Sequence, residues 1–464
     1  MARVLLIQAA VHATHVERAQ PLGLMSLGAF LRAARGDDVR ICDMRLAWRD
    51  FGAPLRMFAE FRPDVVGIGA HGVDAPAMHR LAIAVKSVSP LTPVICGGPY
   101  SALYWEEAVK NAAIDGVAIG EGEHTFREWL DARDGGGAAA PPPGLAFLRD
   151  GRAARSAVRA FEADLDRFPF PAYDLIDLGA YSRLPRIGLI YRHPRYATVE
   201  TARGCPFHCA WCHRSMGDRW RPHSAAYVIA LFEKLVREHG VRDLVIIDDL
   251  VNLDPVRFET ILQGAIDRRL EAGIAVCNGF RADLATDASL DLMARAGVYR
   301  VMIAIETASP RLQKTMAKNL DLERTREVIR RLSARGISVH GNLIVGFPTE
   351  SAEEMRQTVR YAARSQLDTF GLYRATPFRG SRLFEMAVAA GATTPADQGY
   401  LSFWESAVNL STTPSSWLNR FSRLAVPYFY LRPRRLVGLL RRLPHPWRQL
   451  PFLLRFFFRK TLFG

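Results

Sequence analysis

The sequence predicts an α/β protein with a doubly wound N-terminal domain, a partial (β/α)6 barrel and a helical C-terminal tail. Three observations lead to this class. Short apolar runs alternate with segments of helical periodicity over the first 130 residues. The alternation resumes with wider spacing between about residues 191 and 390. A chain of 464 residues also exceeds what one hydrophobic core usually organises.

The first domain is expected over residues 1–133. Its apolar runs are ARVLLIQAA, DVRICDM, DVVGIGA, TPVICGG and DGVAIGEGE, with helix-like segments between them. Strands of this kind are typical of a parallel sheet covered on both faces. Such a sheet binds ligands at the carboxyl ends of its strands. The candidate binding residues there are His71, Gly97, Gly98, Gly120 and Glu121.

Residues 134–190 are expected to connect the two domains. The segment DGGGAAAPPPG is too rich in glycine and proline for regular structure. After it, LAFLRDGRAARSAV predicts a hairpin that turns at Asp150-Gly151. The following DLDRFPFPAYDLIDL suits an extended connector pressed on a surface.

Residues 191–395 are expected to form a partial TIM-type barrel. Six strands are predicted, at YATVETARG, DLVIIDD, IAVCNGF, YRVMIAIE, ISVHGNLIVGF and DTFGLY. Six strand–helix units fall short of the eight that close a full barrel. We therefore expect an open barrel, with its active site at the carboxyl ends of the strands.

The six cysteines divide into two groups. Cys42, Cys96 and Cys277 lie in apolar, strand-like runs and are expected to be buried, inert thiols. The other three form a C-x-x-x-C-x-x-C motif in TARGCPFHCAWCH, directly after the first barrel strand: Cys205, Cys209 and Cys212. Three thiolates suit a 4Fe-4S cluster and leave one iron open to a small molecule that receives an electron.

Two other interpretations of this motif were considered. A Cys3His zinc site could be completed by His208 or His213. However, structural zinc sites usually pair ligands from two separated loops, whereas all candidates here lie within residues 205–213. Unrelated surface thiols this close together would be an oxidation liability. The motif therefore favours an iron–sulfur cluster.

The motif, with the aromatic Trp211 before the last cysteine, resembles the signature of the radical SAM superfamily. The resemblance implies that S-adenosylmethionine chelates the open iron and that Trp211 lies near the adenine. One electron from an external donor would then release a 5′-deoxyadenosyl radical, which takes hydrogen from the substrate.

Later strand ends also fit that superfamily. The resemblance implies partners for the methionyl amine, the carboxylate, the ribose and the adenine, in that order: Asp248 and Asp249; Arg281; Glu306; and Gly341 and Gly346 in GNLIVGFPTE. An exposed turn or helix cap explains the aspartates equally well, and a surface arginine is nearly as good an account of Arg281. TPFRGS matches the last-strand turn, although Arg379 stands where a small residue or proline is expected.

The first domain resembles the Rossmann-like cobalamin-binding domain that precedes the barrel in a large radical SAM subclass. The resemblance rests on PLGLMSLGAFLR, DVVGIGA, VICGGPY and GEGEHTFREWL. The chain lacks the D-x-H-x-x-G element that gives cobalt a histidine in other domains, which implies cobalamin bound without that ligand. His71 is a conceivable neighbour of cobalt, or simply a loop histidine. A flavodoxin-like domain that only orients substrate is the alternative.

Together the resemblances imply a cobalamin-dependent radical SAM enzyme of the class B methyltransferase or bacteriochlorophyll-cyclase type. The expected reaction is methylation of an unactivated carbon in a small-molecule, lipid or pigment substrate. The first alternative is a cyclisation or rearrangement that uses cobalamin without methyl transfer. The second is a non-enzymatic, metal-bearing module that docks at a membrane.

The tail, residues 396–464, carries most of the formal net charge of +14. From Ser406 to Gly464 there are 11 Arg or Lys and no acidic residue. These cations alternate with Trp, Phe and Leu at helical spacing, as in interfacial helices, so we expect peripheral contact with the inner face of a membrane. A helical cap on the barrel is the alternative, and nucleic acid is disfavoured because aliphatics interrupt the basic residues. Without a membrane-spanning run or signal peptide, a cytoplasmic protein is expected.

Overall fold

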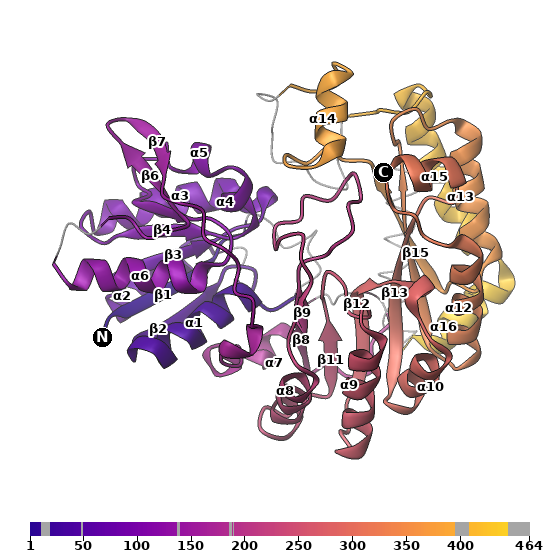
Figure 1. Ribbon diagram of the computed structural model, residues 1–464, viewed down its shortest axis with the longest axis horizontal. Helices are drawn as coiled ribbons and strands as arrows, with labels where there is room; N and C mark the ends of the chain where they lie inside the picture. The colour runs from indigo at the N-terminus through magenta and orange to yellow at the C-terminus, as the bar shows by residue number, and fades with distance from the viewer. Residues whose placement is uncertain are drawn as a thin grey trace. The chain divides into compact units, whose positions relative to one another are not determined.

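The computed structural model describes residues 1–10, 19–47, 50–136, 140–184, 188, 190–394 and 408–443, and the statements below concern these residues. The chain divides into two compact units (Figure 1). Unit 1 comprises Met1–Arg186, Ser215–Gly217 and Arg221–His223, and unit 2 comprises Ile187–Arg214, Asp218–Trp220 and Ser224–Gly464.

Unit 1 contains a seven-stranded sheet in the order β2-β1-β3-β4-β5-β6-β7. Strands β1 to β5 pair in parallel, as the alternating apolar runs predicted. Their bounds are β1 Arg3–Gln8, β2 Asp38–Asp43, β3 Val65–Gly69, β4 Val94–Gly97 and β5 Gly116–Ala118.

The predicted hairpin is present, and it extends this sheet. Strands β6 (Leu145–Arg149) and β7 (Arg152–Arg155) are antiparallel, and β6 pairs with β5. Asp150 and Gly151 both have positive φ, of 50° and 72°. Two such residues are what a tight two-residue hairpin turn requires. The sequence analysis assigned this hairpin to the connector, because no local pattern shows that β6 pairs with β5, almost 30 residues earlier.

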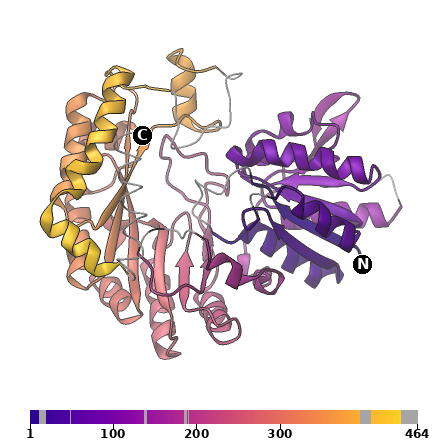
Figure 2. The same ribbon diagram turned by 180° about the vertical axis from the view of Figure 1, so that it is seen from behind.

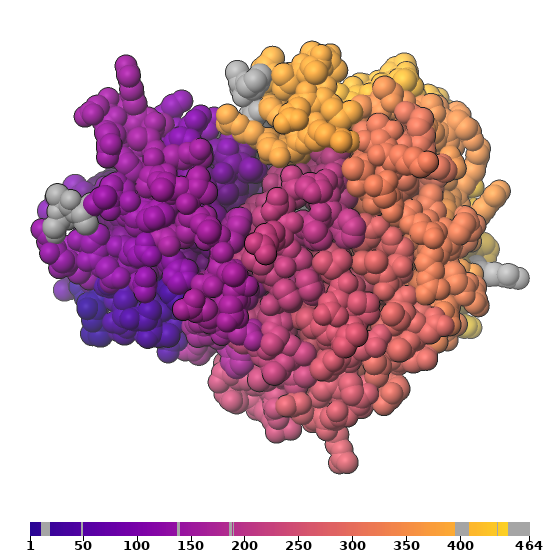
Figure 3. Space-filling view, viewed as in Figure 1, coloured from indigo at the N-terminus to yellow at the C-terminus, as the bar shows by residue number. Residues whose placement is uncertain are grey.

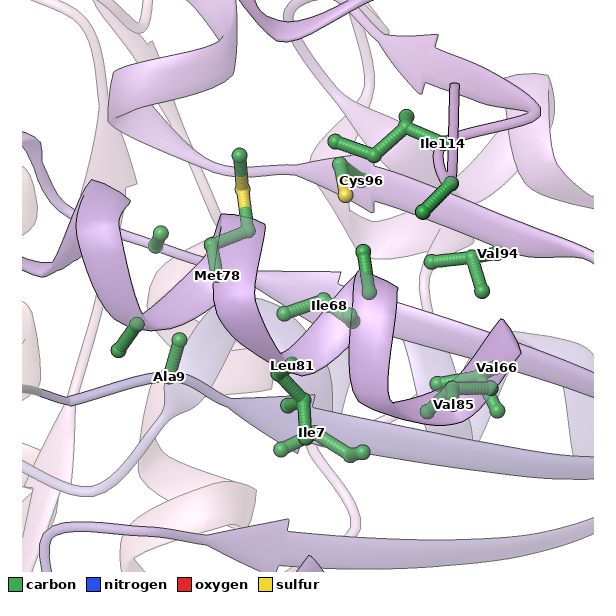
Figure 4. Close-up of a cluster of buried hydrophobic side chains, with 14 of the residues drawn as sticks. Ile7, Ala9, Val66, Ile68, Met78, Leu81, Val85, Val94, Cys96 and Ile114 are labelled. Carbon is green, nitrogen blue, oxygen red and sulfur yellow. The ribbon is translucent and has the colours of Figure 1, made fainter. Parts of the chain in front are cut away.

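The helices of unit 1 cover both faces of its sheet, as expected for a doubly wound domain (Figure 1). They are α1 Leu22–Arg35, α2 Ala53–Phe61, α3 Ala75–Val88, α4 Pro99–Leu103, α5 Trp105–Ala108, α6 Gly122–Asp134 and α7 Leu178–Tyr181. In Figure 4, Ile7 and Ile68 of the strands face Met78 and Leu81 of α3, all in one buried cluster. The short strand β10 (Arg221–Pro222) also belongs to unit 1.

Unit 2 contains the expected six-stranded parallel sheet, in the order β15-β14-β13-β12-β11-β8. Neighbours in the sheet are neighbours in sequence, so the sheet is an open, partial barrel. Its strands are β8 Tyr196–Val199, β11 Asp243–Ile246, β12 Gly273–Phe280, β13 Val298–Glu306, β14 Ser338–Val345 and β15 Thr369–Arg374, with the short β9 Ala202–Arg203 after β8.

Most helices of unit 2 lie on the outside of this sheet (Figure 1), and Figure 3 draws the same view with the atoms as spheres. Their bounds are α8 Ala225–Arg237, α9 Pro255–Asp267, α10 Asp287–Arg295, α12 Leu322–Ala334 and α13 Ala352–Arg364. Two shorter helices, α11 Pro310–Thr315 and α14 Arg382–Ala389, contribute Leu312 and Leu383 to a buried cluster with Ala210 of the cysteine loop. Several of the unit 2 helices begin at a side chain that accepts a hydrogen bond from a first-turn backbone N–H, which fixes where the helix starts. These capping residues are Ser224, Asp254, Thr286, Asp321, Ser351 and Ser381.

Two further helices form the described part of the predicted C-terminal tail. They are α15 (Ser415–Tyr430) and α16 (Pro433–Arg442). The remainder of that prediction, residues 396–407 and 444–464, lies outside the described residues. Within the described parts of the chain, no helix is both long and apolar enough to cross a membrane.

Candidate functional site

The three motif cysteines lie on the loop that follows β8, at the carboxyl edge of the barrel sheet. Cys205 and Cys209 are half-buried and Cys212 is exposed. The loop is fixed at its centre, because Ala210 N donates to Met316 O at 2.9 Å and Leu383 N donates to Ala210 O at 2.7 Å. The other three cysteines, Cys42, Cys96 and Cys277, are buried, as predicted.

The surroundings of these thiols raise their pKa and so favour the protonated form. Loss of water raises the pKa of both Cys205 and Cys209, while the charges of Lys318 and Arg281 lower it. The charge of Cys205 further raises the pKa of Cys209, so the two sulfurs are electrostatic neighbours. Iron bound to these sulfurs would relieve this mutual repulsion. Three thiols on one loop are the kind of donor set that would hold a 4Fe-4S cluster with one open iron. Among the described residues, no three His, Cys, Asp or Glu side chains are arranged around a single metal position.

Trp211 and Gly346 come from distant segments and lie close together. The Trp211 ring packs on the Phe347 ring with centroids 5.3 Å apart. Gly346 has a φ of 91°, a conformation that favours glycine. The loop after β14 therefore presents its backbone beside the aromatic residue of the cysteine motif.

Gly341, in contrast, lies inside β14 and is buried. A side chain there would approach Leu367 Cδ1 to 2.7 Å, so packing alone explains this glycine. A role for Gly341 at an adenine remains a prediction.

Asp248 and Asp249 follow β11 and differ in their surroundings. Asp248 is buried and accepts hydrogen bonds from both the backbone N and the hydroxyl of Thr201. It thereby ties the end of β11 to the start of the cysteine loop. Burial raises the pKa of Asp248 to about 7, although these hydrogen bonds lower it.

Asp249 lies nearer the cysteines and is exposed at the surface. Desolvation raises its pKa, while a hydrogen bond from the backbone of Gly204 and the charge of His213 lower it. Of the two aspartates, Asp249 is therefore the one whose carboxylate remains available for an amine.

Arg281 is buried beneath the cysteine loop. Its guanidinium lies 4.0 Å from the centre of the Phe207 ring. It donates to Asp283 at 2.9 and 2.7 Å, and to the carbonyls of Lys318 and Asn319. Because most of its donors are used, Arg281 braces the loop, and a role at a substrate carboxylate remains a prediction.

Glu306 ends β13 in a strained backbone conformation. Its φ is 65°, in the region that non-glycine residues rarely adopt, and the pairing of β13 with β14 shifts register beside it. Such strain is found at functional sites more often than elsewhere. Burial raises the pKa of Glu306 to about 7, while the charge of Lys318, whose ammonium is 4.0 Å from the carboxylate, lowers it. The charge of the same carboxylate raises the pKa of both Cys209 and Cys212, so Glu306 belongs to the cysteine site.

Three residues of this site were missed by sequence reasoning. Lys318 is the cation nearest Glu306, and it follows α11, away from any strand end. Phe207 is the ring beneath which Arg281 packs. Glu350 is fully buried, and its Oε2 accepts from Gly346 N at 2.6 Å and Phe347 N at 3.0 Å. Glu350 is the last residue of the GNLIVGFPTE segment, so the motif could have pointed to it. Nothing in the sequence indicates that its side chain is buried.

A row of hydrogen-bonded side chains also runs across strands β13, β14 and β15 of unit 2. His340 Nδ1 lies 2.7 Å from the Thr369 hydroxyl, its Nε2 lies 3.1 Å from Asn342 Oδ1, and Asn342 Nδ2 lies 3.1 Å from Met302 Sδ. Burial and the charge of Arg300 lower the pKa of His340 to about 3, so the imidazole is neutral. The signal was the spacing of His340 and Asn342, which puts both on one face of β14.

In unit 1, the predicted binding residues lie at the carboxyl edge of the sheet. Gly98 has a φ of 88°, and a side chain there would meet Ala70 O at 3.0 Å, so the position requires glycine. Gly120 also has positive φ, at 83°, whereas Gly97 ends β4 with no close contact. His71 is exposed and precedes a short 3-10 turn, Gly72–Asp74.

The carboxylate of Glu121 has partners within unit 1. It accepts from Arg221 Nη1 at 2.8 Å and from Glu162 N at 2.8 Å, and it is buried. Arg221 also donates to the Glu162 and Met216 carbonyls. Glu121 therefore holds the edge of unit 1 together, and direct contact with a cofactor remains a prediction.

Comparison with protein families gives two matches. Residues 199–362 match the radical SAM superfamily model, and residues 9–130 match the B12-binding domain model. The first match contains the cysteine loop, Glu306 and Gly346. The second contains the predicted binding residues at the carboxyl edge of the unit 1 sheet.

The chain is similar along most of its length to three curated proteins. It is 28% identical over 90% of its length to an uncharacterized methyltransferase of Pyrococcus horikoshii, covering 89% of that protein. It is 27% identical over 78% of its length to the cytidylyl-2-hydroxyethylphosphonate methyltransferase of Streptomyces wedmorensis, covering 73% of it. It is 25% identical over 82% of its length to the anaerobic magnesium-protoporphyrin IX monomethyl ester cyclase of Rubrivivax gelatinosus, covering 69% of it.

Solved structures share the fold. The cobalamin-dependent S-adenosylmethionine radical enzyme OxsB, with aqua-cobalamin bound, matches 99% of this chain and 75% of its own at a TM-score of 0.74 and 15% identity. The radical S-adenosylmethionine methyltransferase TsrM of Kitasatospora setae, with cobalamin and a [4Fe-4S] cluster bound, matches 85% of this chain and 76% of its own at a TM-score of 0.67 and 22% identity.

Proposed function

Because the chain belongs to the radical SAM superfamily and carries an N-terminal B12-binding domain, we propose that it transfers a methyl group to an unactivated carbon of its substrate. The 4Fe-4S cluster, S-adenosylmethionine and cobalamin supply the radical and methyl-transfer chemistry when bound. The observation that carries the proposal is the placement of Glu306 at the cysteine site, buried and 4.0 Å from the ammonium of Lys318. Similarity to two methyltransferases supports methyl transfer as the outcome.

The residues of the barrel edge divide the work of holding S-adenosylmethionine. Cys205, Cys209 and Cys212 would hold three irons of the cluster. Asp249 would accept from the methionyl amine, because its neighbour Asp248 is committed to Thr201. Glu306 would accept from a ribose hydroxyl, since burial strengthens such a hydrogen bond.

The aromatic residues would complete the site. Trp211 and Phe347, already packed on each other, would contact the adenine and exclude water from the reacting atoms. We propose a small-molecule or lipid-like substrate and an external one-electron donor. The buried free thiols Cys42, Cys96 and Cys277 support a reducing, cytoplasmic location.

A second function is favoured by the similarity to the magnesium-protoporphyrin IX monomethyl ester cyclase. A cyclase or rearrangement enzyme would use the same site without passing on a methyl group. It would form 5′-deoxyadenosine without a matching amount of S-adenosylhomocysteine. A non-enzymatic, metal-bearing module would form neither product.

The test is anaerobic reconstitution of the full chain with iron, sulfide and cobalamin, followed by mass spectrometry of the nucleosides formed with S-adenosylmethionine and a reductant. Methyl transfer predicts equal amounts of S-adenosylhomocysteine and 5′-deoxyadenosine when a substrate is consumed. Without substrate, slow formation of 5′-deoxyadenosine still reports cleavage. Absence of cleavage in protein that holds four irons would contradict the proposal.

A further inference from the structure

Exposed apolar side chains gather on the two C-terminal helices and the turn between them. Among the described residues, a set that we call the apolar stripe lies within 14 positions and comprises Leu424, Tyr428, Leu431, Leu436 and Val437, with exposed fractions of 54, 49, 67, 46 and 46%. Leu424 and Tyr428 are four residues apart and therefore share one face of α15. Outside this stripe, exposed large hydrophobic residues are spread over several elements of the described chain.

The stripe points outward because the opposite faces of α15 and α16 are fixed to the barrel. Leu418 and Phe429 are buried, and Phe429 packs on Phe370 of β15 with ring centroids 4.3 Å apart. Arg435 covers the Phe429 ring at 3.7 Å and donates to the carbonyls of Ala363 and Ser365. Figure 2 shows both helices, in yellow, along the outer side of unit 2. The helices therefore present a fixed surface rather than a loose tail.

Basic side chains border the stripe at both ends. Arg420 and Arg423 are exposed one turn before it, and Arg441 is exposed one turn after it. No acidic residue occurs between Ser406 and Gly464, so the apolar side chains lie within an entirely cationic part of the sequence. Arg442, next to Arg441, pairs with Asp368 at 3.1 Å.

We propose that α15 and α16 dock on the surface of an anionic phospholipid bilayer, with the apolar stripe at the level of the acyl chains. A surface that combines exposed aliphatic and aromatic side chains with arginines at both ends, and with Arg432 over the Tyr428 ring at 5.2 Å, matches the mixed apolar and anionic chemistry of that boundary. Arginines near an anionic membrane gain from its negative surface potential. The proposal concerns where the enzyme works and does not depend on which reaction it performs.

Two other partners fit this surface less well. A second copy of the chain would bring two cationic surfaces together, and like charges resist that contact. Nucleic acid would leave the apolar stripe against phosphates. Residues 444–464 lie outside the described structure, but their sequence continues the same mixture of arginine, tryptophan, phenylalanine and leucine.

The test is sedimentation of the full, cluster-loaded chain with vesicles of phosphatidylglycerol and phosphatidylcholine in equal parts, compared with pure phosphatidylcholine. Binding is expected to the first only, and to weaken as salt is added. The Arg420→Gln/Arg423→Gln/Arg441→Gln variant should bind about a hundredfold more weakly, since each arginine contributes about fivefold. The Leu436→Asp/Val437→Asp variant should not bind detectably.

A matched control is Val88→Asp/Leu91→Asp, which adds the same charges at exposed aliphatic residues of unit 1. It should bind vesicles within twofold of the parent protein. Equal binding to both vesicle types, or an equal loss in the control, would contradict the proposal. So would a change from dimer to monomer, by light scattering without lipid, in the Leu436→Asp/Val437→Asp variant. Iron content and circular dichroism show whether each variant is folded.

Discussion

Both units have their candidate binding residues at the carboxyl edge of a parallel sheet, but the buried carboxylates of the two edges have different partners. In unit 1, the buried carboxylates of Asp43 and Glu121 each pair with an arginine, Arg45 at 2.6 Å and Arg221 at 2.8 Å. In unit 2, Asp248, Glu306 and Glu350 are buried without a comparable ion pair, and the pKa of each is raised. Arginines thus balance the charges of Asp43 and Glu121 at the first edge. At the second edge, hydrogen bonds hold Asp248 and Glu350, and the nearest ammonium to Glu306 is 4.0 Å away, on Lys318.

The comparison depends first on the cysteine loop being a site for the cluster rather than a structural feature. Replacing Cys209 with Ala should remove most of the iron and reduce 5′-deoxyadenosine formation by a factor of about a thousand or more, because one iron loses its protein ligand. Iron analysis and mass spectrometry measure both effects. The matched control Cys42→Ala removes a buried thiol of β2 and should keep iron and activity. Equal losses in the two variants would show that the loop is not special.

The strongest effect on stability is expected in unit 1. Glu121→Ala leaves Arg221 buried without its carboxylate, which should lower the unfolding free energy by about 3–5 kcal/mol. Asp50→Ala removes an exposed partner of Arg56 and should leave the unfolding free energy nearly unchanged, because solvent screens this pair. Urea denaturation followed by circular dichroism measures both. If Glu121→Ala changed the unfolding free energy as little as Asp50→Ala, the ion pair with Arg221 would not stabilise unit 1, and the two edges would not differ in this respect.

In unit 2, buried carboxylates should make stability depend on pH. Burial raises the pKa of Glu350 to about 8, and its Oε1 has no hydrogen-bond partner. The folded state thus favours the protonated form, so this group stabilises the fold at low pH and the contribution is lost as pH rises toward 8. Glu350→Gln should flatten the decrease in unfolding free energy between pH 5 and pH 9, by about 1 kcal/mol for each pKa unit of the shift. Identical pH profiles of the urea midpoint would contradict this.

The backbone of the unit 1 edge should also matter for stability. Gly98→Ala forces a side chain against Ala70 O in a conformation with positive φ, and should cost about 1–3 kcal/mol. Gly72→Ala is the control, because a side chain there meets nothing within 4 Å. The difference in thermal midpoint between the two variants measures the effect, and equal midpoints would mean that the Gly98 turn adapts.

The smallest expected effect is on ligand affinity in unit 2. Glu306→Gln removes a buried carboxylate whose opposing ammonium, on Lys318, is as far as 4.0 Å away, so it should weaken S-adenosylmethionine binding about tenfold while leaving the unfolding midpoint unchanged or higher. Anaerobic equilibrium dialysis of the cluster-loaded protein measures the affinity. Glu327→Gln changes an exposed helix residue and should leave affinity unaltered. A destabilised variant with normal affinity would assign Glu306 to the fold.

The sequence was most informative where structure follows from local pattern. Strands β1 to β5 and the six barrel strands are buried apolar runs, and the cysteines are close in sequence, so both could be predicted. The partners of the charged residues could not be. Arg221 lies 100 positions from Glu121, and Thr201 lies 47 from Asp248. Pairings across such separations depend on the finished fold, and no periodicity of one sequence records them.

The assignment of residues 215–217 and 221–223 to unit 1 means that boundaries along the chain and boundaries in space do not coincide. After the cysteine loop, the chain contributes two short pieces to the first sheet domain and then returns to the second. A fragment that ended at residue 186 would therefore lack the guanidinium that neutralises Glu121. Exchanging the B12-binding part between relatives should therefore succeed only if this short, distant segment is exchanged with it.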